Sequence, residues 1–333
     1  MAVAELERES LGSVREESLS KIVFRRFIRH KLAVAGMFVV LVFVLAALFA
    51  PVVAPFNPYK QNLGPAYGNP SAQHLLGTDE LGRDVFSRLV YAARLSLFIT
   101  LIVNFTTETT GTIVGAISGY FFGWVDIVIQ RFVELLISIP TLPLLLFFSA
   151  MLRGITVPGL PDEWSQAIII SGVLIAFGWT GSTRIVRGMV LSLRGQEFTQ
   201  ASRALGMNSF QIIIRHMIPN SLAPVIVGLT LGLGNVIVLE AALSFLGFGI
   251  TPPVPTWGNM LQNVQERMWQ QPWLAFYPGL CIFLTCWHSI ILVTRCGMRL
   301  TRASSVDGCP TWRCFRLPVA PDCLLGLWWR RRR

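Results

Sequence analysis

The sequence has 333 residues, of which 53% are hydrophobic and only 14% are charged, and its formal net charge is +10. This composition and a positive mean hydropathy exclude an ordinary soluble domain. Nine of the 28 basic residues and two of the 18 acidic ones lie in residues 286–333, so the remainder has 19 basic against 16 acidic residues and is nearly neutral at +3. We therefore do not expect nucleic acid to be a partner.

Six apolar runs are long enough to form membrane-spanning helices, since a bilayer core of about 30 Å needs about 20 apolar residues. They are Leu32–Ala54, Leu95–Ser118, Ile127–Met151, Ala167–Gly188, Leu222–Gly247 and Leu274–Thr294. The sequence therefore predicts an all-α, polytopic membrane protein with six transmembrane helices. The first run is interpreted as a retained anchor, because it is too long for the apolar core of a signal peptide.

Basic residues beside these runs predict how the chain crosses the membrane. They gather before the first run and between the fourth and fifth, at Lys21, Arg25, Arg26, Arg29 and Lys31, and at Arg184, Arg187, Arg194, Arg203 and Arg215. Both segments are expected in the cytoplasm, so residues 1–31 form a cytoplasmic N-terminal segment. Residues 32–54 are then the first transmembrane helix and residues 55–94 an extracytoplasmic loop. The loops 152–166 and 248–273 are also expected outside.

Individual residues in the first half of the chain suggest local features. Pro140 and Pro143 are expected to kink the third span. Asp79 and Asp84, with Arg83 between them in the sequence, could coordinate a ligand. We favour solvated loop charges that cap the next helix, because aspartate is preferred at helix N-termini.

Catalytic motifs are missing from the sequence. The chain has only three lysines, and none follows a glycine, so it holds no phosphate-binding Gly-x4-Gly-Lys-Ser/Thr loop. The four histidines are scattered and form no His-Glu-x-x-His zinc motif, and there is no Gly-x-Ser-x-Gly nucleophile motif. We predict that the chain is not an enzyme, binds no metal or cofactor, and leaves any ATP hydrolysis to another subunit.

The segment EFTQASRALGMNSFQIIIRHMIPNS, which starts at Glu197, is a polar interruption between two apolar spans. Glu197–Leu205 suits a short amphipathic helix, with Phe198, Ala201, Ala204 and Leu205 on one side and Glu197, Gln200 and Arg203 more exposed. Gly206 can end that helix, Phe210–Met217 suits a second one, and Pro219 fits the first turn of the next span. The pattern predicts two short helices joined at a glycine, which we interpret as a docking surface.

This segment resembles the cytoplasmic loop of ABC importer permeases, in which Glu-Ala-Ala, three residues, Gly and nine residues precede Ile-x-Leu-Pro. Gln200, Ala201 and Ser202 occupy the first three positions, and Gly206, Ile218 and Pro219 match the glycine, leucine and proline. The chain departs from the pattern at Gln200, Ser202 and His216. In the family this loop is the coupling helix that binds the ATPase, so the resemblance implies that role for residues 189–219, including Glu197.

Two further segments are similar to the second permease subunit of peptide and nickel importers. They are HLLGTDELGRDVFSRLVYAARLSL, His74–Leu97, and LSFLGFGITPPVPTWGNML, Leu243–Leu261. The resemblance covers about residues 25–285 and implies a type I ABC importer permease fold, with the permease domain at 95–294. It also implies a bacterial plasma membrane location, the inner membrane in a Gram-negative cell. The expected partners are a second permease, two ATPases that bind ATP and Mg²⁺, and an extracytoplasmic peptide-binding protein.

Three glutamates, Glu108, Glu134 and Glu240, lie inside predicted spans, where an uncompensated charge costs about 3 kcal/mol or more. We expect them to face a cavity or a partner, and Glu240 to contact the other permease or hold a helix bend. The alternative function is a secondary transporter driven by an ion gradient, with these glutamates as a proton relay. A membrane scaffold is a weaker alternative, because it leaves the acids unexplained.

Residues 295–333 form an aberrant, basic tail rich in cysteine and tryptophan. We interpret the sequence from about residue 286 as frameshifted. Back-translation of the segment from Cys286, read one frame over, can spell LAFNYLGDALRDALDPR, which resembles the normal end of these permeases. The cysteine spacing there includes no Cys-x-x-Cys pair, so a metal or disulfide module is less favoured.

Overall fold

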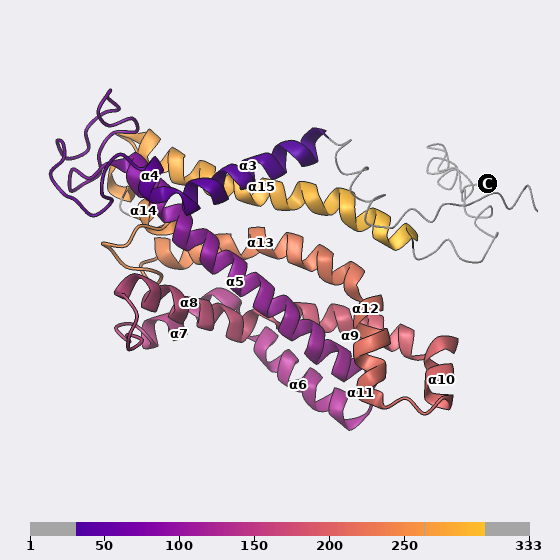
Figure 1. Cartoon of the computed structure of the whole chain (residues 1–333). Helices are drawn as coiled ribbons and strands as arrows, with labels where there is room; N and C mark the ends of the chain where they lie inside the picture. The colour runs from indigo at the N-terminus through magenta and orange to yellow at the C-terminus, as the bar shows by residue number, and fades with distance from the viewer. Residues whose placement is uncertain (1–30, 263, 304–333) are drawn as a thin grey trace, which may run out of the picture.

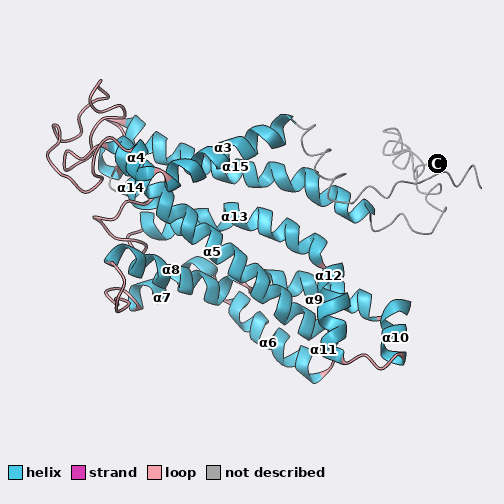
Figure 2. Cartoon of the chain, in the orientation of Figure 1, coloured by secondary structure: helices cyan, strands magenta, loops and turns pink. Residues whose placement is uncertain are grey.

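The computed structural model describes residues 31–262 and 264–303. Within this part of the chain the regular elements are helices, and Figure 2 shows no strand among them. The elements are α3 (Lys31–Leu48), α4 (Ala50–Val53), α5 (Val85–Tyr120), α6 (Trp124–Ser138), α7 (Thr141–Met151), α8 (Asp162–Gly178), α9 (Thr180–Arg194), α10 (Glu197–Ala204), α11 (Ser209–Ile212), the π-helix η1 (Ile213–Met217), α12 (Ile218–Asn220), α13 (Leu222–Phe245), α14 (Trp257–Gln262), the 3-10 helix η2 (Gln265–Arg267) and α15 (Pro272–Ala303).

Three helical segments in the described residues are long and apolar enough to cross a membrane: α5, the segment α8–α9 (Asp162–Arg194) and α13. The pair α6–α7 is a fourth if its bent halves form one span. Val34–Leu48 of α3 and Pro272–Trp287 of α15 are shorter apolar helices. The all-α membrane class is therefore as predicted, and by length and composition the described residues confirm three or four of the six predicted spans.

Helix α5 begins at Val85, ten residues earlier than the predicted second span, so residues 85–94 of the predicted loop are helical. Asp84 caps the helix by accepting a hydrogen bond from the backbone N–H of Ser87 at 2.8 Å. Arg88, which falls in the predicted loop, is buried in this helix. At about 1.5 Å per residue the helix is ~54 Å long, so it extends well beyond a bilayer core.

The predicted third span is broken between α6 and α7, whose axes differ by 86°. Pro140 precedes α7 with an extended backbone, which confirms the predicted kink at this proline. Pro143 does not kink a helix, because it lies in the first turn of α7, where its missing N–H has no intrahelical partner to lose.

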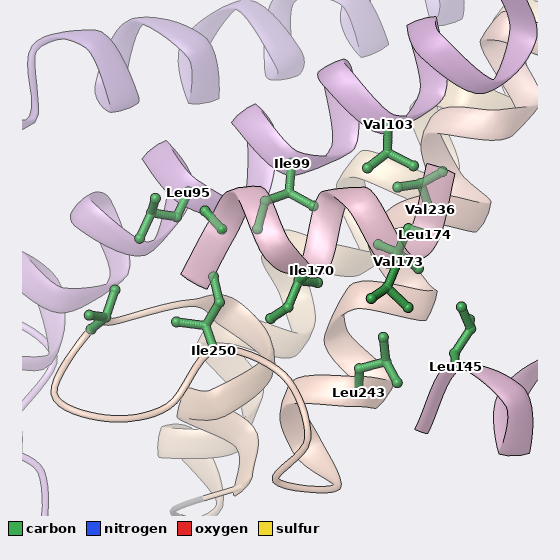
Figure 3. Packing of buried hydrophobic residues seen from close by; sticks show 12 residues of the cluster. Leu95, Ile99, Val103, Leu145, Ile170, Val173, Leu174, Val236, Leu243 and Ile250 are labelled. Atoms are coloured by element: carbon green, nitrogen blue, oxygen red, sulfur yellow. The ribbon is translucent and has the colours of Figure 1, made fainter. Parts of the chain in front are cut away.

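Helix α5 runs through the middle of the bundle, between α13 with α15 on one side and α8 and α9 on the other (Figure 1). One buried apolar cluster joins α5 to α7, α8, α13 and the loop after α13 (Figure 3). Gly111, Gly115 and Gly119 form a stripe on α5 against α9, and a Cβ at Gly115 would lie 2.6 Å from the carbonyl oxygen of Thr183. Small residues at this spacing let two helix backbones approach closely, as is common between membrane helices.

The loops separate to the two ends of the bundle. The α4–α5 loop (residues 54–84), the α7–α8 turn and α14 lie at one end, and α10 and α11 lie at the other (Figure 1). The loops predicted to lie outside and the loop predicted to lie in the cytoplasm are thus at opposite ends of the bundle. The predicted N-terminal segment 1–31 lies outside the described residues except for Lys31. The helix α15 continues past the predicted end of the sixth span at Thr294, and residues 304–333 of the tail are outside the described residues.

Candidate functional site

The polar interruption forms an elbow, Glu197–Pro219, whose first limb is α10. Two small polar side chains of this helix point inward and are satisfied by backbone carbonyls. The hydroxyl of Thr199 donates to the carbonyl of Leu193 at 2.8 Å, and that of Ser202 donates to the carbonyl of Phe198 at 2.7 Å. Both polar residues are buried, so α10 lies with its hydroxyl-bearing side against the body.

The predicted apolar side of α10 is therefore at the surface rather than in a core. Leu205 is 85% exposed, and Phe198, Ala201 and Ala204 are exposed as well. In the second limb, Phe210 is 63% exposed. Glu197, Gln200 and Arg203 are exposed, as predicted. Large apolar side chains held in water at the end of the bundle are typical of a surface that another protein covers.

Gly206 sets the angle of the elbow. Its φ is +80°, in the left-handed region where side chains with a Cβ are strained. The N–H of Gly206 donates to the carbonyl of Arg203 at 2.9 Å, and the N–H of Met207 donates to the carbonyl of Ser202 at 3.1 Å. These two bonds form the Schellman motif that ends a helix. Asn208 and Gln211 then form a capping box that starts α11.

The second limb differs from the predicted helix Phe210–Met217, because it consists of α11, the π-helix η1 and α12 in succession. Ile212, Ile213 and Met217 are buried in a cluster that includes Ala116 of α5 and Val190 of α9. Pro219 lies in the first turn of α12, as predicted, and Ile218 is partly buried beside the same cluster. The second limb is thus part of the packed core, whereas the first limb lies on the surface.

Aromatic and charged groups link the two limbs to each other and to α5. The ring of Phe198 lies 6.1 Å from that of His216, so the histidine that departs from the family pattern contacts α10. The guanidinium of Arg203 lies 5.1 Å from the ring centre of Tyr120, the last residue of α5. Gln200 donates to the carbonyl of Gly195 at 3.3 Å. A force on α10 would therefore reach α5 and η1 directly.

Glu240 is fully buried and joins α13 to α5. It accepts hydrogen bonds from the hydroxyl of Ser244 at 2.9 Å and from that of Ser96 at 3.3 Å. Ser96 in turn accepts a bond from the backbone N–H of Trp257 at 3.3 Å. Glu240 therefore holds helices together within the chain, and neither a cavity nor a partner surface is open to it.

Glu108 lies between α5 and α13 as well. A Cβ at Gly228 would lie 2.8 Å from both of its carboxylate oxygens, so the glycine provides the space for the acid. One turn away, the amide of Asn104 donates to the carbonyl of Leu229 at 2.6 Å. Ser96, the contact of Glu240, is twelve residues from Glu108, or ~18 Å along α5. The two buried acids are therefore separate packing contacts.

Glu134 is exposed on α6, where its carboxylate lies 3.3 Å from Arg131, itself largely exposed. It is thus placed differently from the two buried acids and on another helix. The three glutamates that the sequence singles out do not form one cluster.

One ion pair between helices was not predicted from the sequence. Asp126, at the start of α6, accepts two bonds from Arg187 of α9 at 2.5 and 2.6 Å, and a third from the hydroxyl of Ser118 at 2.6 Å. The partners are 61 residues apart, and Arg187 lies in the middle of α9, so no local pattern indicated the pair.

In the α4–α5 loop, the prediction of solvated charges is wrong. Arg83 is 1% exposed and donates to Asp79 at 2.6 Å and to Glu80 at 2.7 Å. The ring of His74 is buried beside Asp84, with Nδ1 and the carboxylate 3.0 Å apart. The loop folds over these charges, and only the capping role of Asp84 is as predicted.

The comparisons with known proteins identify the family. Residues 111–302 match the family described as the binding-protein-dependent transport system inner membrane component. The chain belongs to this family. Residues 18–70 also match the N-terminal transmembrane domain of oligopeptide transport permease C.

Curated relatives of the chain are peptide permeases of this family. The dipeptide transport system permease protein DppC of Alkalihalophilus pseudofirmus is 39% identical over 261 residues, which are 78% of this chain and 82% of the relative. The oligopeptide transport system permease protein OppC of Bacillus subtilis is 34% identical over 80% of this chain and 84% of the relative.

A solved structure of the MetNI methionine ABC transporter, in an inward-facing conformation, has the same fold, with a TM-score of 0.50 at 20% identity. The match covers 66% of this chain and 96% of that one. The family is one of transport permeases rather than enzymes. Among the described residues there is no group of three histidine, cysteine or acidic side chains that could hold a metal ion.

Proposed function

We propose that this chain is a permease subunit of an ATP-driven peptide importer, in which the elbow Glu197–Pro219 binds a cytoplasmic ATPase. The observation that carries this proposal is the elbow itself, where a left-handed Gly206 presents Leu205 and Phe210 to solvent. Family membership and the dipeptide and oligopeptide permeases among the relatives support the transport of peptides. They support the importer and not the alternative of an ion-driven carrier.

The proposed layout has six crossings, made by α3, α5, the bent pair α6–α7, the pair α8–α9, α13 and α15. The N-terminal segment 1–31 and the coupling loop 189–219 are cytoplasmic, and the α4–α5 loop is extracytoplasmic. The helices from α5 onward form the permease domain. The chain resides in the bacterial plasma membrane, the inner membrane of a Gram-negative cell.

The proposed partners are a second permease, two ATPase subunits and an extracytoplasmic peptide-binding protein. ATP and Mg²⁺ bind to the ATPases, which move the elbow when they close. Because η1 packs on α5 and α9, and Arg203 contacts Tyr120, this movement turns the central helices. The cavity between the two permeases then opens alternately to each side, as in other rigid-body transporters.

The test is peptide uptake by the full transporter in proteoliposomes that contain ATP. The proposal predicts uptake of a radiolabelled dipeptide that vanadate abolishes and that a protonophore leaves unchanged. Uptake that resists vanadate and collapses with the protonophore would instead indicate a carrier that uses the glutamates as a proton relay.

A further inference from the structure

Helix α6 carries a polar stripe formed by Arg131, Glu134 and Ser138. Their spacing of three and four residues places them on one side of the helix. The side chain of Arg131 is 80% exposed and that of Glu134 is 50% exposed, although the two form an ion pair at 3.3 Å. Ser138 is exposed as well, and its hydroxyl donates to the carbonyl of Leu135 at 2.7 Å.

The stripe lies deep in the expected membrane. Helix α6 begins at Trp124, an exposed residue of the type that marks a membrane interface. At about 1.5 Å per residue, Arg131 and Glu134 lie ~10 and ~15 Å from this start, which is the middle of a ~30 Å core. A charged side chain at that depth almost always faces a protein interior or a water-filled cavity, because lipid does not solvate it.

The break between α6 and α7 gives a second, independent indication that this side of α6 faces protein or water. The stripe ends where α6 turns into α7 through 86°, at the exposed residues Ile139 and Pro140. Carbonyl groups in the last turn of a helix have no intrahelical partners. Irregular backbone at membrane depth is tolerated only where protein buries it or where it lines a water-filled cavity.

The other sides of α6 pack against the rest of the chain or expose apolar side chains. Only Asp126 and Val133 of this helix, all of which is described, are buried against the rest of the chain. Phe132 is 53% exposed and, at 100° per residue, lies about 120° round the helix from Ser138, where it gives an apolar side that suits lipid or an apolar protein surface. Figure 1 shows α6 at the edge of the bundle, on the side away from α3. The stripe is therefore an exposed polar surface on a lightly packed helix.

We propose that Arg131, Glu134, Ser138 and the break at Pro140 line the water-filled path through which the solute crosses the membrane. The guanidinium and the carboxylate present one positive and one negative charge to that path, and this arrangement suits zwitterionic solutes such as short peptides. The inference rests on the proposed transport function and names the part of this chain that contacts the solute.

Accessibility of a cysteine tests the path without requiring transport. The variants Ser138→Cys and Phe132→Cys are compared in the full transporter in proteoliposomes, with a cationic, membrane-impermeant methanethiosulfonate on both sides. We expect Ser138→Cys to react at least about tenfold faster, because the reactive thiolate forms only in water. The unsubstituted chain, with its six cysteines, gives the background.

Equal reaction of the two variants, or no reaction of Ser138→Cys, would place the stripe against lipid or against the second permease and overturn the inference. In that case ATP-driven dipeptide uptake by the unsubstituted transporter would still support the proposed function. If that uptake were missing while Ser138→Cys reacted rapidly, the path would stand and the proposed function would fail.

Charge selectivity tests the roles of Arg131 and Glu134. We expect Glu134→Gln to lower the ratio of dilysine to dialanine uptake, and Arg131→Gln to raise it, each by about two- to fivefold, as for one screened charge. A structural role would change the uptake of both dipeptides alike. Unchanged ratios in both variants would show that the charges do not face the solute.

Discussion

The α4–α5 loop and the elbow lie at opposite ends of the bundle, and they differ in which side chains they bury (Figure 1). In the loop, Arg83 and Asp84 are each 1% exposed; Arg83 pairs with Asp79, and the carboxylate of Asp84 lies within hydrogen-bond distance of His74. In the elbow, apolar Leu205 and Phe210 are left in solvent while the hydroxyls of Thr199 and Ser202 are buried.

This contrast indicates what each end requires. The loop bonds its buried charges through its own side chains and through the start of α5, so we expect its fold not to depend on the ATPase. The elbow has an apolar surface that water solvates poorly, on a backbone fixed by Gly206 and anchored through η1. Variants at the loop should therefore affect stability, whereas variants at the elbow should affect assembly.

The largest effect is expected for Arg83→Ala. This change leaves the buried carboxylate of Asp79 without its 2.6 Å partner, and breaking a buried pair typically costs about 3–5 kcal/mol. Thermal unfolding in detergent, followed by tryptophan fluorescence, should show a large fall in Tm. Arg153→Ala, at an exposed arginine of the same end, is the control. Equal melting of the two variants would contradict the self-sufficient loop.

At the elbow, the double variant Leu205→Ser with Phe210→Ser should lose binding of the ATPase while its melting temperature stays unchanged. Central apolar anchors of an interface contribute about 2 kcal/mol or more each. Co-purification with the tagged ATPase measures this loss. The matched control is Leu75→Ser, at an exposed leucine of the α4–α5 loop, which should bind normally.

A smaller effect is expected for Gly206→Val. No atom would lie within 4 Å of the new Cβ, so the expected effect arises from the φ of +80° alone, about 1–2 kcal/mol for a residue with a Cβ. The variant should weaken ATPase binding and dipeptide uptake. Gly206→Asn, which tolerates this conformation, should retain most of both. If valine and asparagine behaved alike, the turn would not set the docking geometry.

The smallest effect concerns pH and Glu80. Burial, followed by the nearby charge of Asp79, raises the pKa of Glu80 above its ordinary value of 4.5. The folded loop then holds a proton that the unfolded chain has released, so this residue's contribution to stability falls as pH rises from 4.5 through the raised pKa. The difference in Tm between the protein and Glu80→Gln, measured across this range, should follow that trend. A flat difference would refute it.

The sequence predicted the features that depend on local chemistry. The spacing from Gly206 to Pro219 located the elbow, Pro140 located the break in the third span, and Asp84 was a predicted cap. Each of these depends on the backbone preference of a single residue, and such preferences act within a few positions.

Features that depend on distant contacts were not predictable. Arg83 reads as a solvated loop charge until the loop folds over it, and Asp126 gives no sign that Arg187 will pair with it. Glu240 appeared open to a partner, yet Ser96 from a helix 144 residues away satisfies it. The exposure of Leu205 also depends on which side of α10 meets the body.

The C-terminal frameshift stays a prediction. The family match runs to residue 302, and the helix α15 to Ala303, while the tail beyond lies outside the described residues. Resequencing of the gene around the codon for Thr285, compared with a close relative, would show the slip. A reading frame that agrees with the relative throughout would refute it.

The central claim is that the ATPase binds at the elbow and not at the opposite end. Leu205→Cys and Leu75→Cys provide matched exposed positions at the two ends for cross-linking to the ATPase with a short bifunctional maleimide in the assembled transporter. We expect the cysteine at position 205 to form a cross-linked product well above the unsubstituted background, and the one at position 75 to form none. Cross-linking at position 75, or none at position 205 in a transporter that retains its ATPase, would contradict the claim.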